Sequence, residues 1–290
     1  MNARQGSQGR NRRRQDGRDG QERQDGVGWR MRLAAWLCVG LVAASCGSAP
    51  QPPARRGRVR VAAASDLNAV LTDVIARFGA AHDVDVAVSY GSSGNFYAQL
   101  LNQAPFDVFL SADVLYPNQL AARGLTLPQS EFTYAFGRLV LWAPPASPLD
   151  VEHDGLQVLK QSSIAHLSIA NPEHAPYGRA AVAAMQAAGV YDVVKPKLVL
   201  GENVAQAMQF VQSGAADVGL VAMALAVAPN VKGKGRMFEV QPASYPRVEQ
   251  GGTILKWAAD VDAARAFRGF LLSADGQAIL KQFGFSVPDR

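Results

Sequence analysis

Residues 58–78 read RVRVAAASDLNAVLTDVIARF and combine two hydrophobic periods in one short stretch. In the first part, Val59, Val61 and the run Ala62 to Ala64 are small and apolar, as expected for a strand inside a parallel sheet. Beyond Leu67 the apolar residues recur every three or four positions, which predicts a helix that packs one face on that sheet. Ser65 stands at the change of period, in the N-cap position, where a hydroxyl can accept a hydrogen bond from a free backbone N–H. Such a helix start can bind an anion, although a simple cap is the plainer interpretation of one unit taken alone.

The same construction, a strand followed by a polar helix start, occurs four times along the chain. It recurs at GSSGN (91–95), at NPEHAPYG (171–178) and at GENV (201–204). The four junction residues are Ser65, Ser93, Tyr177 and Val204. None of them has a lysine, arginine or histidine directly beside it, and the sequence offers no cysteine–histidine cluster for a metal ion. The four junctions offer N–H and hydroxyl donors but no cationic side chain. Such a set can bind a dehydrated oxyanion by hydrogen bonds alone.

The positive charge of the chain is confined to its beginning. The formal net charge of the 290 residues is +5, and residues 1–32 carry nine arginines and four acidic residues, so the remainder sums to zero. Because residues 33–290 carry no net charge and no cluster of basic and aromatic residues, nucleic acid is not expected as a partner. The length is sufficient for one large domain or two modest domains with a real core.

Residues 1–46 are interpreted as a basic segment followed by a signal peptide. The first 30 residues are almost free of apolar side chains and are expected to be disordered. Residues 33–45 are mostly apolar and follow two arginines. This stretch is too short for a transmembrane helix but matches the hydrophobic region of a signal peptide. Met31 is an alternative start of the protein.

Cys46 is the expected lipidation site. The sequence Ala43-Ala44-Ser45-Cys46 resembles a bacterial lipobox, although Ala43 stands where leucine is usual. Residues 47–57 then form a flexible tether that can hold a domain off a membrane. Simple cleavage to a soluble form remains an alternative. The other cysteine, Cys38, lies within the hydrophobic region, so the exported body has no disulfide framework.

The rest of the chain predicts an α/β fold with two domains joined by two hinge crossings and a ligand crevice between them. Residues 143–145, Ala-Pro-Pro, end a strand at which the chain leaves the first domain. Two C-terminal helices within 262–283 are expected to pack back on that domain. The expected domains are lobe one at 58–142 and 246–290, and lobe two at 143–245.

Six motifs resemble, in order, the periplasmic molybdate-binding proteins of ABC importers. They are AAASDL, GSSGN, PFDVFLSAD, NPEHAPYG, GENV and GQAILKQFGF, and the resemblance extends from Val59 to Phe285. It implies a two-lobed periplasmic-binding-protein fold that holds a tetrahedral dianion through serine hydroxyls, backbone amides and a tyrosine hydroxyl. On this resemblance Ser65 and Ser93 supply hydroxyls and amides, and Val204 supplies a backbone amide.

The chain departs from the family pattern at two places. One branch of the family takes its tyrosine from the strand after Asp217, where this chain has Ala222, so the resemblance assigns the hydroxyl to Tyr177, as in another branch. Asp66 stands where that branch can have asparagine. Because a carboxylate repels a dianion, the Asp66 side chain is expected to turn outward and to offer only its backbone N–H.

The sequence therefore predicts an extracytoplasmic binding protein that captures molybdate, or tungstate, and delivers it to an ABC permease. It is expected to be a monomer without enzymatic activity or cofactor, either periplasmic or anchored to the membrane. A site of donors alone should also reject hydrogen phosphate, whose O–H needs an acceptor. The alternative is an exported serine hydrolase that uses Ser93 or Ser65 with His174. A third possibility, the sensing half of a regulator, lacks a DNA-binding segment.

Overall fold

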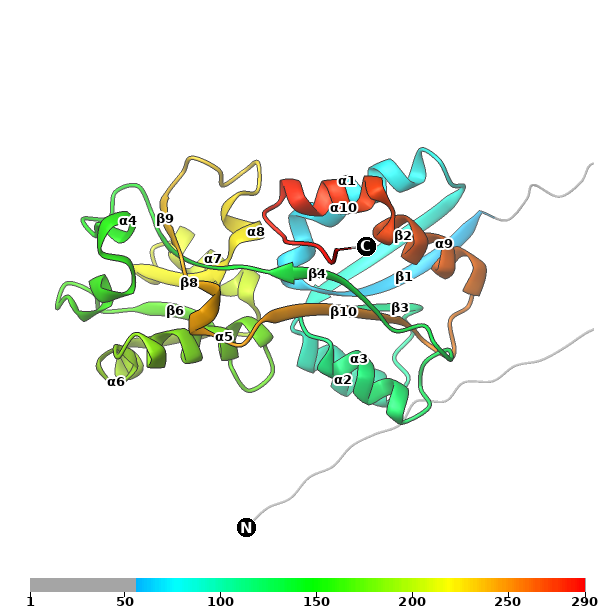
Figure 1. Ribbon diagram of the computed structural model, residues 1–290, viewed down its shortest axis with the longest axis horizontal. Helices are drawn as coiled ribbons and strands as arrows, with labels where there is room; N and C mark the ends of the chain where they lie inside the picture. The colour runs from blue at the N-terminus through cyan, green and yellow to red at the C-terminus, as the bar shows by residue number, and fades with distance from the viewer. Residues whose placement is uncertain (1–55, 290) are drawn as a thin grey trace, which may run out of the picture. The chain divides into compact units, whose positions relative to one another are not determined.

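The computed structural model describes residues 56–289, which form two α/β lobes side by side (Figure 1). The two-domain α/β fold expected from the sequence is confirmed. The predicted signal peptide, most of the predicted tether, Met31 and Cys46 lie outside the described residues. Within residues 56–289, no helix is long and apolar enough to cross a membrane.

Lobe one is built on a five-stranded sheet with the order β2-β1-β3-β10-β4. Its strands are β1 (Gly57–Ala64), β2 (Val84–Gly91), β3 (Val108–Ser111), β4 (Phe132–Gly137) and β10 (Val248–Ile254). Strand β1 runs parallel to β2 and β3, whereas β10 is antiparallel to both β3 and β4. The chain thus returns from lobe two along β10 into the middle of the first sheet.

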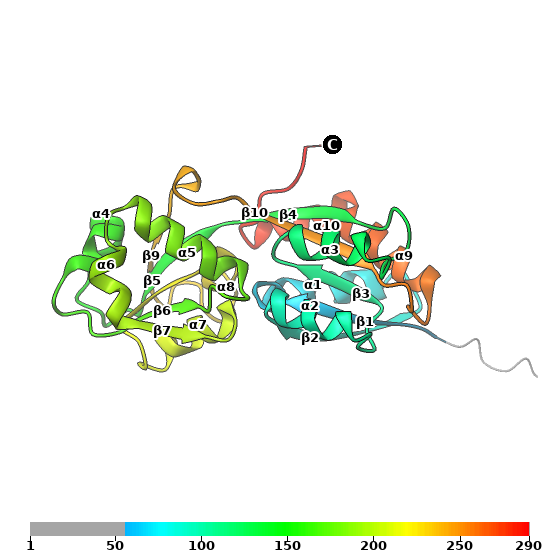
Figure 2. The same cartoon turned by 90° about the horizontal axis from the view of Figure 1, so that it is seen from below.

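Helices cover both faces of this sheet, which explains why β1 is apolar and buried from Val61 to Ala64. They are η1 (Ser65–Leu67, a 3-10 turn), α1 (Asn68–Gly79), α2 (Ser93–Leu101), α3 (Leu115–Ala122), α9 (Val261–Leu272) and α10 (Ala274–Gln282). Helices α1, α9 and α10 share one core with Val59 and Val61, while α2 and α3 pack with Ala62 on the other face (Figures 1 and 2). The expected packing of the C-terminal helices on lobe one is therefore confirmed.

Lobe two repeats the plan with a five-stranded sheet in the order β7-β6-β8-β5-β9. Its strands are β5 (Leu139–Ala143), β6 (Leu167–Ala170), β7 (Leu198–Gly201), β8 (Val218–Ala222) and β9 (Arg236–Glu239). Strand β6 is parallel to β7 and β8, and β5 is antiparallel to β8 and β9. The helices are α4 (Val151–Asp154), η2 (Gly155–Lys160), α5 (Pro176–Ala187), α6 (Tyr191–Val194), η3 (Lys195–Lys197), α7 (Val204–Gln212), α8 (Met223–Ala226) and η4 (Pro242–Ser244).

The first crossing between the lobes lies earlier than the expected boundary at 142–143. Strand β4 ends at Gly137 in the first sheet, and β5 begins at Leu139 in the second. Strand β5 is buried along its whole length because it lies between β8 and β9, so it belongs to the core of lobe two. The return crossing lies between β9 and β10.

Candidate functional site

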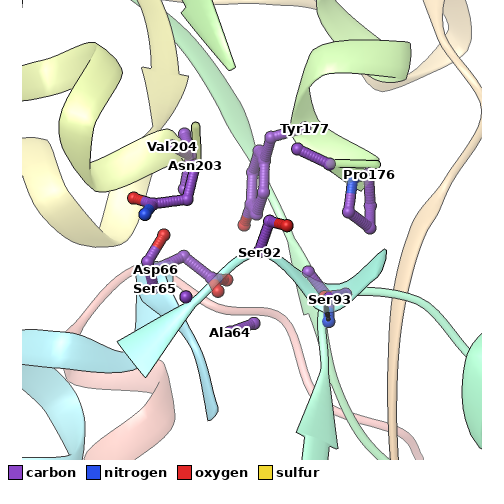
Figure 3. Close-up of a pocket in the computed structure, with 12 residues that line it drawn as sticks. Ala64, Ser65, Asp66, Ser92, Ser93, Pro176, Tyr177, Asn203 and Val204 are labelled. Carbon is purple, nitrogen blue, oxygen red and sulfur yellow. Dashed lines mark hydrogen bonds between the residues drawn. The ribbon is translucent and has the colours of Figure 1, made fainter. Parts of the chain in front are cut away.

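A small cavity lies between the lobes, where the four predicted helix starts meet (Figure 3). Its volume is about 10 Å³. Lobe one contributes Ala64, Ser65, Asp66, Gly91, Ser92, Ser93 and Ala112, and lobe two contributes Ala175, Pro176, Tyr177, Asn203 and Val204. All five residues expected to contact the ligand, Ser65, Asp66, Ser93, Tyr177 and Val204, line this cavity.

Ser65 does not cap the helix that follows it, so that expectation is wrong. The 3-10 turn η1 separates β1 from α1, and neither the turn nor the helix has a side-chain cap. Instead, the Ser65 hydroxyl accepts a hydrogen bond of 3.2 Å from the backbone N–H of Ala205 in lobe two. Because its oxygen already accepts this bond, the hydroxyl proton remains available to a ligand in the cavity.

The two serines of GSSGN have different partners. Ser92 is the N-cap of α2 and accepts from the backbone N–H of Asn95 at 3.2 Å. The Ser93 hydroxyl accepts from the backbone N–H of Ala112 at 2.9 Å, which orients it in the same way as Ser65. Gly94 permits the close approach of lobe two, because a Cβ at this position would lie 2.7 Å from the carbonyl oxygen of His174.

Tyr177 enters the cavity from the first turn of α5, which begins with Pro176 (Figure 3). The side chain is buried, and its hydroxyl oxygen accepts a hydrogen bond of 3.3 Å from the amide of Gln250 on β10. Burial, and to a smaller extent the nearby Asp66, raise the pKa of Tyr177 well above its ordinary value. The hydroxyl therefore keeps its proton and can act as a donor.

Asn203 is the N-cap of helix α7, which begins at Val204. Its side chain accepts from the backbone N–H groups of Ala205 and Gln206, at 3.1 and 3.0 Å. This N-cap fixes the first turn of α7 against the cavity, where Val204 is the first helical residue. The positive end of the helix dipole thus faces the cavity together with the Val204 N–H.

Asp66 does not turn outward, which corrects the sequence-based expectation. The residue is fully buried, and its Oδ2 accepts a hydrogen bond from the Gln250 amide. Burial raises the pKa of Asp66 to about 6, against the opposing effect of hydrogen bonds from Gln250, Tyr177 and the backbone. The carboxyl is retained inside because Gln250, on the returning strand β10, provides a polar partner there. Since Asp66 in its ionised form is an acceptor, the expected rejection of hydrogen phosphate loses its basis.

His174 contacts a serine, but neither of the two expected for a hydrolase. Its Nδ1 lies 2.9 Å from the Ser92 hydroxyl, and its Nε2 lies 3.7 Å from a carboxylate oxygen of the partly exposed Glu202. Ser65 and Ser93 are instead bonded to backbone N–H groups. The distance of 3.7 Å to Glu202 exceeds hydrogen-bond range, so the acid does not orient the imidazole as a catalytic triad requires.

Further polar contacts join the lobes around the cavity. Arg179 of α5 forms an ion pair with Asp113 of lobe one and lies over the ring of Tyr116, 5.8 Å from its centroid. Asn95 donates to Glu202 across the same gap. The charge of Arg179 is therefore paired with Asp113 at the rim. Among residues 56–289, no group of three or more histidine, cysteine, aspartate or glutamate side chains could hold a metal ion.

Three residues of the site were not predicted from the sequence. Ser92 is adjacent to the predicted Ser93, and Asn203 precedes a predicted helix, so N-cap preference could have identified both. Gln250 had no such signal, because it lies in a strand 184 positions after Asp66.

Comparisons with known proteins agree on one family. Residues 59–286 match the family model described as bacterial extracellular solute-binding protein. The molybdate-binding protein ModA of Rhodobacter capsulatus is 38% identical, over 80% of this chain and 90% of that protein. ModA of Azotobacter vinelandii is 37% identical, over 88% of this chain and 97% of that protein. The solved structure of the Azotobacter vinelandii periplasmic molybdate-binding protein superimposes with a TM-score of 0.74 at 34% identity, over 80% of this chain and all of that chain.

Proposed function

The chain belongs to the bacterial extracellular solute-binding proteins, and we propose that it captures molybdate, or tungstate, between its lobes and delivers it to the permease of an ABC importer. Relatives that cover most of the chain are named for molybdate binding, and one of them has the same fold. They are binding proteins of a transport system, so the chain is not an enzyme.

The observation that carries the proposal is the convergence of hydrogen-bond donors in one interlobe cavity. The hydroxyl oxygens of Ser65, Ser93 and Tyr177 each accept a hydrogen bond from an N–H group of the protein. The Ser65 and Ser93 hydroxyls then have their protons to offer to a ligand, and the Tyr177 hydroxyl, which also hydrogen-bonds to Asp66, can turn its proton to the ligand once Asp66 is protonated. The helix start at Val204 adds a backbone donor and a dipole end. A tetrahedral dianion presents four oxygens that only accept, which complements such a set.

The proposed site contacts are made through the oxygens of the anion. Ser65, Ser93 and Tyr177 donate their hydroxyl protons, while Asp66 and Val204 donate backbone N–H groups. The bound metal atom is the cargo, held inside its oxyanion, and no cofactor takes part. Because Ser65 and Ser93 belong to lobe one, and Tyr177 and Val204 to lobe two, the anion links the lobes. Binding and closure are then one event.

The hydrolase alternative receives no support from the comparisons. His174 contacts Ser92, whose hydroxyl is occupied as the N-cap of α2. The pair spans the two lobes, as do the contacts of Asn95 with Glu202 and of Asp113 with Arg179. We interpret His174 as part of the contact surface between closed lobes.

The test is calorimetric titration of the purified protein with molybdate, tungstate, sulfate and phosphate. Tight binding of molybdate and tungstate, with weaker binding of sulfate, is the expected result, and the phosphate titration reports whether Asp66 acts as an acceptor. Absence of molybdate binding would contradict the proposal. Comparison of molybdate with tungstate also decides which of the two the site prefers.

We further propose that the exported protein functions as a monomer and that Cys46 becomes its lipid-bearing N-terminus. The apolar stretch before Cys46 and the Ala-Ala-Ser-Cys sequence support this proposal. Mass spectrometry of the protein from its native host should find a diacylglycerol on Cys46. An unmodified mature N-terminus downstream of Cys46 would show that the protein is released instead.

A further inference from the structure

Asp66 places a carboxyl group inside the cavity that we propose binds a dianion. The residue is fully buried, and Oδ2 is held by the amide of Gln250. Its other oxygen, Oδ1, is buried without a hydrogen-bond partner among residues 56–289. Figure 3 shows the carboxyl extending toward the Tyr177 hydroxyl and Ser92, at the centre of the lining residues. Oδ1 is therefore the Asp66 atom available to a ligand.

An ionised Asp66 and a dianion would oppose each other strongly in this position. In the ligand-free site, burial raises the pKa of Asp66 to about 6 even against the hydrogen bonds that lower it. A second negative charge within contact distance raises the pKa of a carboxyl further, because it destabilises the ionised form. The anion itself therefore favours the protonated state of Asp66.

The groups packed around Asp66 provide no compensating charge. Tyr177 of α5 and Tyr134 of β4 both have a pKa raised well above the ordinary value by burial, so both remain neutral. Gln250 of β10 is a neutral amide. The charged or titratable groups at the rim are His174, Glu202 and the ion pair of Asp113 with Arg179. None of these four is among the groups that shift the pKa of Asp66.

We propose that Asp66 binds the captured oxyanion as a neutral carboxylic acid that donates the proton on Oδ1 to an anion oxygen, so that each capture takes up one proton from solvent. This inference rests on the proposed function, because it requires a fully deprotonated anion in the cavity. No covalent bond of the anion changes, and the proton is added to Asp66 alone. Oδ2 continues to accept from Gln250, which leaves Oδ1 as the carboxyl oxygen without a partner in the protein.

Calorimetric titration of the purified protein with molybdate, in buffers of different ionisation enthalpy, counts the protons taken up. At pH 7 we expect close to one proton per anion, because an acid with a pKa of about 6 is mostly ionised before binding. The Kd for molybdate should rise with pH, by up to about tenfold per pH unit between pH 7 and 8.

Asp66→Asn is the matched variant, since asparagine has nearly the same shape and can donate a hydrogen bond but does not titrate. It should take up no proton, and its Kd should not vary between pH 6 and 8. His174→Gln removes the titratable ring at the rim and should retain the proton uptake of the parent. Thermal unfolding of the ligand-free proteins checks that each variant is folded. It should also show that the parent, relative to Asp66→Asn, loses stability as pH rises from 5 to 7, because the folded-state pKa of Asp66 is raised.

If Asp66→Asn took up as many protons as the parent, the proton would belong to another group. The same would follow if His174→Gln took up none. Either result would overturn the inference. Molybdate binding without proton uptake, together with tight binding of hydrogen phosphate, would show that Asp66 acts as an ionised acceptor and would also overturn it. Molybdate binding without uptake leaves the proposed function intact. Failure to bind molybdate at any pH contradicts both proposals.

Discussion

At the scale of single residues, the site depends on hydroxyl groups whose oxygens are already engaged. Ser65 accepts from Ala205, Ser93 from Ala112 and Tyr177 from Gln250. A hydroxyl that accepts such a hydrogen bond still has its own proton to donate. The protein thus converts groups that could donate or accept into donors for an anion without introducing a cation.

Tyr177→Phe should weaken molybdate binding by about ten- to a hundredfold. The change removes one donor from the anion, and a hydrogen bond to a charged group contributes about 1.5–3 kcal/mol. Calorimetric titration measures the effect. Tyr191→Phe in α6, outside the cavity, is the control and should bind like the parent. If Tyr177→Phe also binds like the parent, the hydroxyl is not a ligand.

At the scale of elements, the site is a meeting of helix starts, and their caps position the donors. The 3-10 turn at Ser65, the N-cap Ser92, Pro176 and the N-cap Asn203 each determine how the following turn faces the cavity. The strands next to the two crossings, β10 and β4, also help to position the groups of the site. Gln250 on β10 bonds both Asp66 and Tyr177, and Gly137 at the end of β4 makes room for the tyrosine hydroxyl.

Asn203→Ala should lower both stability and molybdate affinity. It removes the acceptor of two backbone N–H groups at the start of α7, at a cost of about 1 kcal/mol, and loosens the turn that presents Val204. Ser273→Ala is the matched control, because Ser273 caps α10 of lobe one, away from the cavity. It should cost similar stability in thermal unfolding and leave the Kd unchanged. Equal affinity losses in the two variants would mean that the cap acts only through stability.

Gly137→Ala should impair binding through Tyr177. A Cβ at Gly137 would lie 2.1 Å from the Tyr177 hydroxyl, so the hydroxyl must shift from its present position. We expect a loss of affinity of at least about tenfold, and a stability cost of about 1–3 kcal/mol for overpacking. Gly269→Ala in α9, where a Cβ meets no atom within 4 Å, is the control and should leave affinity unchanged. Parent-like binding by Gly137→Ala would show that the hydroxyl position is not critical.

At the scale of the whole molecule, two lobes of similar plan share one ligand cavity. Each contributes two of the four helix starts, and each has its own five-stranded sheet and core. Polar contacts from Asn95 to Glu202 and from Asp113 to Arg179 join the lobes around the cavity. These contacts hold the two lobes together at the edge of the cavity.

Molybdate affinity should depend only weakly on ionic strength. No lysine, arginine or histidine lines the cavity, and Arg179 at its rim is paired with Asp113. An anion attracted by distant lysines would be screened at a Debye length of about 8 Å in physiological salt. Titration at low and at physiological salt, at constant pH, is the measurement. A large loss of affinity with salt would indicate that long-range charge, rather than local donors, holds the anion.

The sequence by itself determined the class of fold and the positions of the four helix starts. Both follow from local patterns, since the change of hydrophobic period at Ser65 and the glycine-rich turn before α2 are contained in a few neighbouring residues. Tyr177 was assigned to the site through resemblance to a family, and the structure places it in the cavity with the others.

Only the tertiary structure decided what several of these residues do. Ser65 accepts from Ala205, 140 positions away, and Asp66 is held inside the cavity by Gln250, 184 positions away. The first crossing lies at Gly137 because β5 pairs with strands β8 and β9, which come much later in the chain. Contacts between residues so far apart in the chain produce no periodic pattern in the sequence. A local pattern shows that a donor or an acid is present, and the packing of remote strands determines which way it faces and whether it keeps its charge.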